Sequence, residues 1–389
     1  MGFFCETSSK FLSLIVAATL INVISAAVPA DLYRNVNQTV GLNSTIGNDT
    51  SSREARRSVV SGGLFSIVSF DNVACNGTSG EVGTCYSQAE CNTLGGTTNG
   101  RCAGNYGVCC TIKYTCGATV TANNSYLVNP GYPATVSGPL TCSYTVVQIK
   151  GATSFYLEFI KFDIRGPSGP CTNDTFTVTQ SGVTTAFPTL CGDNDGQMEY
   201  IQWATKSSLF KRSIKGGSLG GITLPSLIQS KATLTFTLAA GSDARSWQIR
   251  VVQFKSTDAC NAPAGCTQYY NDPSNMGTVQ SYNYNGGQGE FIASNSCSQR
   301  CFRLPTGYCS MTLTEDTFML PGTAPNTCTT DYLLINGQRY CGDTLGTNGA
   351  VTVTQVTGMN YLTITECSGP SNADMDLGYS LRYMLQPCT

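Results

Sequence analysis

Strict alternation of apolar and polar residues characterises the chain from about residue 116 onward. In "ATLTFTL" (232–238), Leu234, Phe236 and Leu238 fall on one face, and threonines occupy the other. "SWQIRVV" (246–252) has the same period, whereas "SFYLEFIKF" (154–162) is apolar on both faces. A period of two indicates a half-buried β-strand, and a strand apolar on both faces is typical of the centre of a sandwich. Because helical periodicity is scarce, the pattern predicts an all-β fold.

Four sequence blocks occur twice in the same order. "CTNDTFTV" at Cys171 returns as "CTTDYLLI" at Cys328, and "LCGD" at Cys191 returns as "YCGD" at Cys341. "LTFTL" then returns as "LTIT", and "SWQIRVVQF" is matched by "GYSLRYMLQ". Ordered repetition of this kind indicates two copies of one structural unit. We therefore expect two β domains, at about 116–256 and 260–389.

The first copy carries a basic insertion within 199–231, which has no acidic residue after Glu199. Its cations are Lys206, Lys211, Arg212, Lys215 and Lys231. Such a segment would suit an anionic partner, or cleavage at Lys211–Arg212. The alternative that we favour is a flexible surface loop or a mis-spliced segment.

The N-terminal region has the pattern of a targeting sequence followed by a polar leader. Lys10 precedes the apolar run Phe11–Ala27, which predicts a signal peptide over 1–27, with an uncleaved anchor as the alternative. Residues 28–64 contain no cysteine and little apolar periodicity, which predicts a disordered leader or propeptide. The leader contains Arg53, Arg56 and Arg57, which form either a processing site or a solvated charge cluster.

Twenty cysteines are typical of a secreted, disulfide-bonded chain. Cys5 lies in the predicted signal, and the nineteen that remain predict one free or intermolecular thiol and allow a disulfide-linked dimer. Six cysteines lie within 65–112, where adjacent Cys109 and Cys110 must bond two different earlier cysteines because a bond between them is strained. Six N-x-Ser/Thr acceptors are glycosylation candidates: Asn37, Asn43, Asn48, Asn76, Asn123 and Asn173.

Composition excludes several function classes. The chain has no histidine, which excludes Ser-His-Asp and Cys-His nucleophilic mechanisms and the common zinc-hydrolase sites. Only 12% of residues are charged and the net charge is −2, so no field favours nucleic acid or an acidic membrane. An acid pair such as Asp193 and Asp195 could serve glycoside hydrolysis, but nothing places it in a cleft. We expect a secreted, soluble protein that is not an enzyme.

The first copy resembles a CUB domain. The resemblance rests on the spacing of Cys116, Cys142, Cys171 and Cys191, on "NPGYP", "FIKFDI" and "LCG", and on the "CTND" strand start. It implies a two-layer antiparallel jelly-roll sandwich with the pairs Cys116–Cys142 and Cys171–Cys191. The second copy is similar to divergent CUB domains of secreted arthropod proteins, with Cys328–Cys341 as its counterpart pair.

The six-cysteine segment resembles a compact clip-type module. That resemblance implies the following pairs: Cys75–Cys109, Cys85–Cys102 and Cys91–Cys110. Clip modules and CUB domains often accompany proteases, but neither carries catalysis.

Many CUB domains hold calcium with a glutamate, the C-x-x-D aspartate and a later aspartate. The latter two positions correspond to Asp174 and Asp243, but Arg165 occupies the glutamate position. The second copy keeps Asp331 and offers at best Glu366. Exchanging a ligand carboxylate for a guanidinium changes the local charge by two units, so we expect no calcium or other cofactor. Arg165 is expected to pair with Asp174 or Asp243 instead.

The function predicted from these features is that of a non-catalytic binding or adaptor protein that recognises an extracellular protein or glycan. The stretch "QYYNDPSNMGTVQSYNYN" (268–285) offers tyrosines for recognition, or else those tyrosines pack between strands. A structural component of matrix or cuticle is the alternative function. The sequence does not identify the partner.

Overall fold

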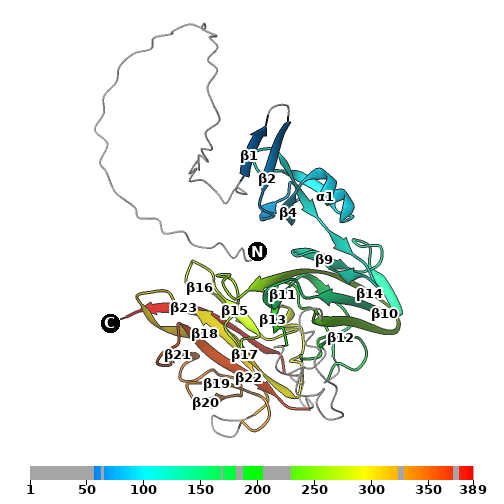
Figure 1. The fold of residues 1–389 in the computed structure, drawn as a ribbon. Coiled ribbons are helices and arrows are strands. Elements are labelled where there is room, and N and C mark those ends of the chain that lie inside the picture. Colours follow the sequence, from blue (N-terminus) through cyan, green and yellow to red (C-terminus); the bar gives the residue numbers. More distant parts are fainter. Residues whose placement is uncertain are drawn as a thin grey trace, which may run out of the picture.

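A computed structural model of the chain describes residues 57–62, 65–167, 170–180, 187–204, 229–322, 328–370 and 376–388. Within these ranges the protein is almost entirely β-structure, and the predicted all-β class is confirmed. A small cysteine-rich module precedes two sandwiches (Figure 1). The predicted signal peptide, the first three glycosylation candidates, Arg53 and Arg56 lie outside the described residues. So do all the insertion cations except Lys231.

The start of the described chain corrects one expectation. Residues 57–62, predicted to lie in a disordered leader, form strand β1 (Arg57–Gly62), which pairs with β2 (Phe65–Phe70). In the backbone register Val59 is the partner of Val68, and Val60 is the partner of Ile67. β-Branched residues favour strands, but this preference depends on context. The short run Val59–Val60 forms a strand because a second short strand lies a few residues away and pairs with it. The leader prediction was wrong for these six residues.

The cysteine-rich module is a four-stranded sheet with one short helix. Helix α1 (Gln88–Thr93) begins at a capping box, because Ser87 and Glu90 bond each other's backbone N–H groups. The strands lie in the order β3-β4-β6-β5. Their bounds are β3 (Ala74–Asn76), β4 (Val82–Tyr86), β5 (Thr97–Cys102) and β6 (Gly107–Thr111).

The first sandwich is organised around β14 (Lys231–Lys255), a 25-residue strand that belongs to both layers. Its first half pairs with β10 (Val136–Val147) and β12 (Thr175–Gln180). Its second half pairs with β11 (Ala152–Asp163), which in turn pairs with the edge strand β13 (Met198–Gln202). Three short strands complete the sandwich: β7 (Lys113–Tyr114), β8 (Thr119–Val120) and β9 (Ser125–Val128).

The core of this sandwich has the composition that the alternation predicts. Leu234, Phe236 and Leu238 are buried together with Trp247, and the threonines between them are not. The rings of Phe236 and Trp247 stack with centroids 4.1 Å apart. The indole Nε1–H donates to the Tyr144 hydroxyl at 2.9 Å, so the polar edge of the buried ring has a partner.

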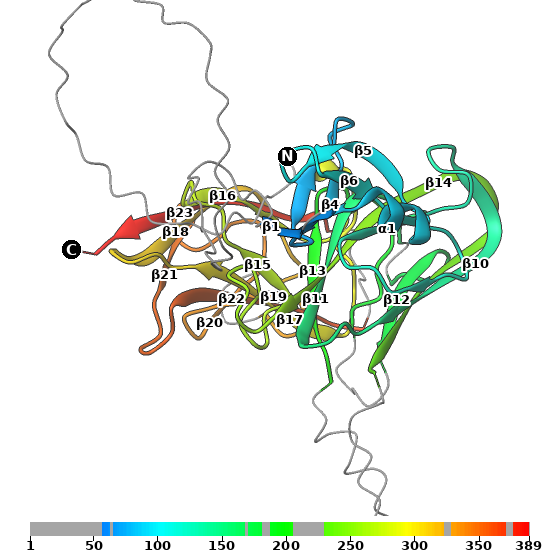
Figure 2. The same cartoon turned by 45° about the horizontal axis from the view of Figure 1, so that its top comes forward.

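The second sandwich packs a five-stranded sheet, in the order β15-β17-β22-β19-β20, on a four-stranded sheet, in the order β16-β23-β18-β21 (Figure 2). The first sheet contains β15 (Gln268–Tyr270), β17 (Ser296–Arg303), β19 (Tyr332–Ile335), β20 (Gln338–Tyr340) and β22 (Tyr361–Ser368). The second contains β16 (Met276–Gln280), β18 (Tyr308–Met319), β21 (Ala350–Thr354) and β23 (Gly378–Pro387). A single 3₁₀ turn, η1 (Asn285–Gly287), follows β16.

Disulfides cross-link segments within each of the three bodies. The module contains Cys75–Cys109, Cys85–Cys102 and Cys91–Cys110. The first sandwich contains Cys116–Cys142 and Cys171–Cys191. The second contains Cys266–Cys301, Cys297–Cys367, Cys309–Cys388 and Cys328–Cys341. All six pairs that the resemblances imply are among these.

The expected free thiol is absent from the described part of the chain. None of the described cysteines is free, and buried Cys260 is disulfide-bonded like the others. The prediction of an odd thiol depended on a count of nineteen that set Cys5 aside, and it was wrong for the described cysteines. The disulfide-linked dimer stays a prediction.

Strand β13 joins the two sandwiches. Met198 and Tyr200 lie on one face of this strand and, with Tyr156 of β11, they pack into the core of the second sandwich. In return, Tyr282 and Ile292 of the second sandwich pack into the core of the first. The Tyr200 backbone N–H also donates to the Thr267 carbonyl at 2.6 Å, next to β15. The two sandwiches therefore share a buried joint. Figures 1 and 2 show the two sandwiches side by side.

We predict that Tyr200→Ala destabilises both sandwiches. Removing a buried aromatic ring costs about 3 kcal/mol or more, and this ring fills the second core from a strand of the first. Hydrogen–deuterium exchange should show lower protection in β19 and β22 as well as in β13. Val356→Ala, at a valine that is 54% exposed, is the control and should change stability by less than about 0.5 kcal/mol. Unchanged protection of β19 and β22 in Tyr200→Ala would contradict a shared core.

Candidate functional site

Asp174 lies at the start of β12 and is only 1% exposed. Its Oδ2 accepts the backbone N–H of Arg165 at 2.9 Å, and its Oδ1 accepts the backbone N–H of Ala239 at 2.9 Å. Arg165 follows the end of β11, and Ala239 lies where β14 bends between the two layers. One carboxylate therefore connects three segments at a corner of the sandwich, which we call the aspartate corner (Asp174, Asp243, Arg165 and Arg245).

Arg245 provides the charge that compensates Asp174. Its side chain is fully buried, and its Nε donates to Asp174 Oδ2 at 2.8 Å. Other guanidinium N–H groups donate to the carbonyls of Asp243 at 2.7 Å and of Gly241 at 3.3 Å. Burial alone favours the neutral acid, but the Arg245 bond and the two backbone bonds lower the pKa of Asp174 below its ordinary range.

Arg165 and Asp243 form the outer pair of the aspartate corner. The Arg165 Nε donates to Asp243 Oδ2 at 2.9 Å, and Nη2 contacts the same oxygen. The Asp243 side chain is 57% exposed, so water screens this pair far more than the inner one. The bond and the charge of Arg165 lower the pKa of Asp243. Gly241 permits the approach, since a Cβ there would collide with the Arg165 guanidinium.

The sequence located this corner but missed one of its members. Of the two partners expected for the Arg165 side chain, the structure selects Asp243, while Asp174 accepts only the Arg165 backbone N–H. Arg245 was not considered, although "GSDARS" places an arginine two residues after Asp243 at the bend of β14. The corner therefore holds two carboxylates and two guanidinium groups, and the charges balance.

The second copy does not bring its two acidic residues to one corner. Asp331 is buried and accepts the Gly369 backbone N–H at 3.0 Å, much as Asp174 accepts backbone donors. Glu366 is instead bound by Arg300 at 2.9 Å and by the Tyr379 hydroxyl at 2.6 Å. Among the described residues, no group of three or more His, Cys, Asp or Glu side chains is placed to hold a metal ion.

The acid pair considered for hydrolysis lies in the turn that precedes β13, beside the end of β11. Asp195 accepts the Phe162 backbone N–H at 2.6 Å and pairs with Lys161 at 2.9 Å. Asp193 accepts the Asp195 backbone N–H at 3.0 Å. Burial raises the pKa of Asp193. The contacts of both side chains are those of turn residues.

The described glycosylation candidates differ in accessibility. Asn76 and Asn173 are exposed. Asn123 is half-buried, and its side chain bonds the backbone of Gln253 on β14 through both its amide N–H and its carbonyl oxygen. A glycan at Asn123 would therefore compete with a contact of the fold.

The tyrosine-rich stretch serves packing. Tyr270, Tyr282 and Tyr284 are buried, and Tyr269 is half-buried against the joint. The tyrosine cluster is therefore not an open recognition surface.

The fold and its disulfides define the chain as a tandem of disulfide-bonded antiparallel β-sandwiches. Residues 116–215 match the family model described as CUB domain, and residues 263–386 match the model described as Animal CUB domain. The chain therefore contains two CUB domains.

Three solved structures illustrate what this chain is similar to. The CUB1-EGF-CUB2 domains of rat MASP-1 are 13% identical, and the match covers 70% of this chain and 99% of that one, with a TM-score of 0.24. The same domains of human MASP-1/3 are 13% identical, with 67% and 98% covered and a TM-score of 0.24. The extracellular region of zebrafish Gpr126/Adgrg6 is 11% identical, with 70% and 36% covered and a TM-score of 0.27. No curated protein matches the chain.

We predict that Asp174→Asn is severely destabilising and that Asp243→Asn is mild. The first change leaves a fully buried guanidinium without its counter-charge, which costs about 3–5 kcal/mol. The second removes an exposed pair, which contributes about 1 kcal/mol or less. Chemical denaturation of both variants gives the comparison. Equal losses would mean that the inner pair does not support the corner.

The inner pair also predicts acid sensitivity. Because the native pKa of Asp174 is lowered, its contribution is fully present above the ordinary value of 3.8. That contribution is lost as pH falls through the lower native pKa. Denaturation midpoints measured from pH 5 to pH 2 should fall more steeply for the wild type than for Asp174→Asn. Parallel curves would exclude this carboxylate as the cause.

Proposed function

We propose that this protein is a secreted, non-catalytic binding protein that presents its CUB domains as a preorganised recognition surface for an extracellular protein or glycan. CUB domains are generally extracellular interaction modules without enzymatic activity. No helix in the described part of the chain is long and apolar enough to cross a membrane. The disulfides and the predicted signal sequence support export to an oxidising compartment.

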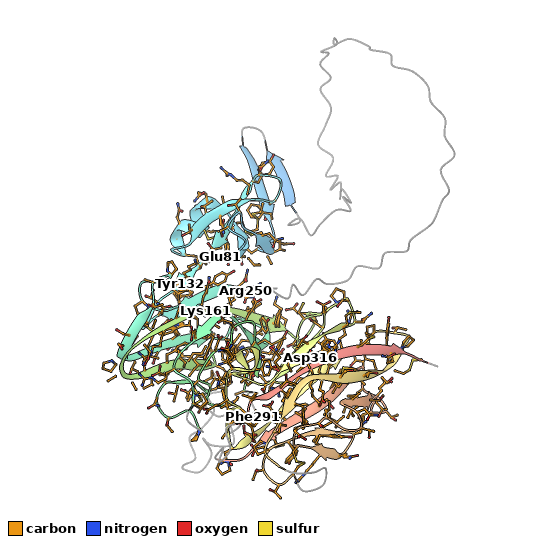
Figure 3. All side chains as sticks on the ribbon, turned by 180° about the vertical axis from the view of Figure 1, so that it is seen from behind. Glu81, Tyr132, Lys161, Arg250, Phe291 and Asp316 are labelled. Carbon is orange, nitrogen blue, oxygen red and sulfur yellow. A yellow bond between two sulfur atoms is a disulfide. The ribbon has the colours of Figure 1, made fainter. Side chains whose placement is uncertain are left out.

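The observation that carries this proposal is the interlocking of the three bodies. The cysteine-rich module docks on the first sandwich through Asn124, whose Nδ2 donates to the Gly83 carbonyl at 2.7 Å, and through the Tyr126 hydroxyl, which donates to the Val82 carbonyl at 2.8 Å. Glu81, labelled in Figure 3 on the cysteine-rich module, adds an ion pair with Lys113 at 2.6 Å. The joint at β13 fixes the second sandwich. Loops at fixed separations bind with less ordering cost, because the surface is already formed.

The chemistry of the described residues supports binding without catalysis. The chain has no histidine to serve as a general base. The acids considered for hydrolysis have the contacts of turn residues, as described above. Loops held by a rigid scaffold are where recognition residues are found in sandwiches of this kind.

The aspartate corner supports a binding mode that does not use calcium. Calcium requires six to eight oxygen ligands, several of them from carboxylates. Here both aspartates are already paired with guanidinium groups, and Arg165 occupies the position where the resemblance places a ligand glutamate. We propose that Arg165 and Arg245 hold the loops in the arrangement that a cation maintains in calcium-binding relatives.

This proposal predicts that calcium leaves stability unchanged. The melting temperature of the wild-type protein in millimolar calcium should equal that in a chelator within about 1 °C. A ligand at 100 times its dissociation constant would add about 2.7 kcal/mol and raise the melting temperature by several degrees. Magnesium at the same concentration controls for ionic strength. A calcium-specific rise would contradict the proposal.

Direct binding measurements test the proposed function itself. The purified, oxidised protein is immobilised and exposed to extracellular fluid and to a panel of glycans, and the reduced and alkylated protein serves as the control. We expect saturable binding that requires the intact disulfides. Absence of saturable binding, or binding equal in the reduced control, would contradict a preorganised recognition surface.

A further inference from the structure

Glu199 is a buried acid at the joint between the two sandwiches. It lies on β13 and is 2% exposed. The Tyr282 hydroxyl of the second sandwich contacts both the Glu199 carboxyl and, at 2.9 Å, the Met198 carbonyl. A hydroxyl carries one proton and can donate only once. When that proton goes to the Met198 carbonyl, Glu199 keeps its contact with the hydroxyl oxygen only by donating a proton of its own.

The charged groups behind Tyr282 are a second acid and a single base. Arg300 is fully buried on β17, and its guanidinium lies 5.8 Å from the Tyr282 ring centroid and 5.5 Å from that of Tyr379. Arg300 pairs with Glu366 at 2.9 Å, and Glu366 also accepts the Tyr379 hydroxyl. The cluster thus holds two carboxyl groups and one guanidinium. If both carboxyls were ionised, one buried negative charge would have no compensation.

Among the described residues, Arg300 is the only cation whose charge acts on Glu199. Its register partner on β11 is Leu157, and the groups that face it from β17 and β22 are Arg300 and Glu366. The remaining titratable groups around the cluster are the phenols of Tyr270, Tyr282 and Tyr379, whose pKa values burial raises. Burial is also the main reason that the pKa of Glu199 rises to about 8.

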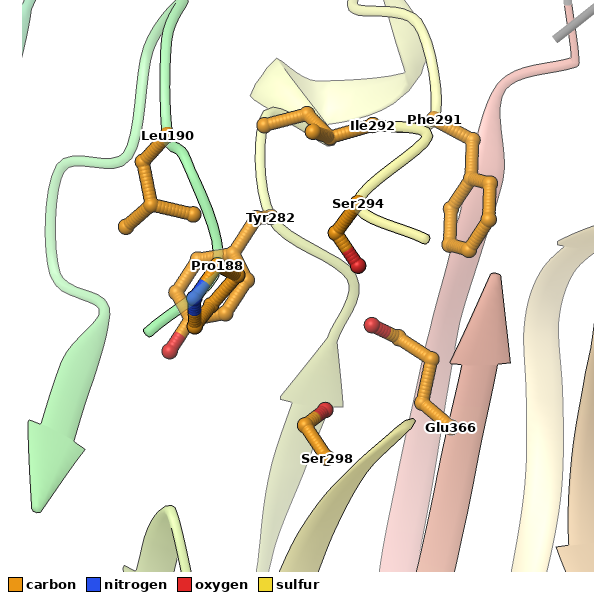
Figure 4. A pocket seen from close by; sticks show the side chains of 8 residues that line it. All are labelled: Pro188, Leu190, Tyr282, Phe291, Ile292, Ser294, Ser298 and Glu366. Carbon is orange, nitrogen blue, oxygen red and sulfur yellow. The ribbon is translucent and has the colours of Figure 1, made fainter. Parts of the chain in front are cut away.

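The cluster lies where the sandwiches hold each other. Close to it, the Asn283 backbone N–H donates to Asn194 Oδ1 at 2.8 Å, and the Asp193 backbone N–H donates to Asn283 Oδ1 at 2.9 Å. Figure 4 shows Tyr282 and Glu366 on opposite sides of a small cavity of about 10 Å³, with Ser294 and Ser298 between them. Such a cavity is close to the minimum size for one water molecule. A carboxylate that forms in this cluster is therefore stabilised by little solvent.

We propose that the joint between the two CUB domains is controlled by a proton: neutral Glu199 keeps the sandwiches closed on each other, and loss of that proton favours their separation. The device needs only this chain and hydroxide ion. The proton leaves the Glu199 carboxyl as water forms, and the resulting carboxylate gains solvent when β13 separates from Tyr282. It would make the spacing of the two binding domains depend on pH.

The direction in which pH changes the stability of the joint follows from the two states of Glu199. In the open state the acid is solvated and titrates near its ordinary value of 4.5, whereas in the closed joint its pKa is about 8. The stability of the closed joint is therefore fully present below about pH 4.5 and is lost progressively as pH rises to about 8. Each pH unit in this window favours opening by about tenfold, because one proton is released. Above the window the dependence ends.

Hydrogen–deuterium exchange tests the proposal. Protection factors of the amides in β13 and around Tyr282, corrected for intrinsic exchange, should fall by up to about tenfold per pH unit between pH 5 and 8 in the wild type. Glu199→Gln, which mimics the neutral acid, should remove this slope. Glu158→Gln is the matched control in the same sheet, because the Glu158 carboxylate pairs with Arg250 of the first sandwich and not with a group of the second. It should keep the wild-type slope. A flat wild-type profile, or an equal slope in Glu199→Gln, would overturn the proposal.

A measurement on the wild type does not depend on any variant folding. The chain has nine glutamates, few enough for their carboxyl carbons to be resolved by NMR after ¹³C labelling. We expect one glutamate carboxyl to titrate near pH 8, together with chemical-shift changes at the Tyr282 ring. If all glutamate carboxyls titrate below pH 6, the joint contains no neutral glutamate at physiological pH and the proposal is wrong.

Discussion

The burial of β13 on both faces is the constraint on which the rest of the structure depends. An edge strand with an open side exposes backbone donors and apolar side chains, and proteins cover or pair such edges. Here the second sandwich provides the cover, through the Thr267 carbonyl, and accepts Tyr200 into its own core. The first sandwich accepts Tyr282 in exchange. Two domains that could have been connected only by a linker thus become one body.

A second interaction, the aspartate corner of the first sandwich, also fixes the arrangement of segments. The bend of β14 lets one strand serve both layers, and the bend is held by buried Arg245 against Asp174. A buried ion pair adds little net stability, but separating its two members leaves an uncompensated buried charge, which is costly. It therefore specifies the loop geometry. Arg165 closes the outer side of the corner, and the carboxylates have their charge balance within the chain.

Much of this fold could be predicted from the sequence, because alternation reports burial directly. The faces of β14 followed from it, the two domains followed from the repeated sequence blocks, and the resemblances implied six of the disulfides. The joint could not be predicted, since a pattern that marks Tyr200 as buried does not identify the body that buries it. Arg245 was missed because charged residues normally face water, and β1 because its partner strand is equally short. The sequence also did not predict that Cys260 is disulfide-bonded, because the expectation of a free thiol rested only on the odd number of cysteines that remain without Cys5.

The central claim is that the two CUB domains have one fixed relative orientation. Residual dipolar couplings of backbone amides, measured in both sandwiches of the wild-type protein at mildly acidic pH, report this orientation directly. When the couplings are fitted to the structure in which the two domains interlock at β13, a single alignment tensor should fit both domains. Two tensors of different magnitude or orientation would show that the domains move independently, and they would contradict the account.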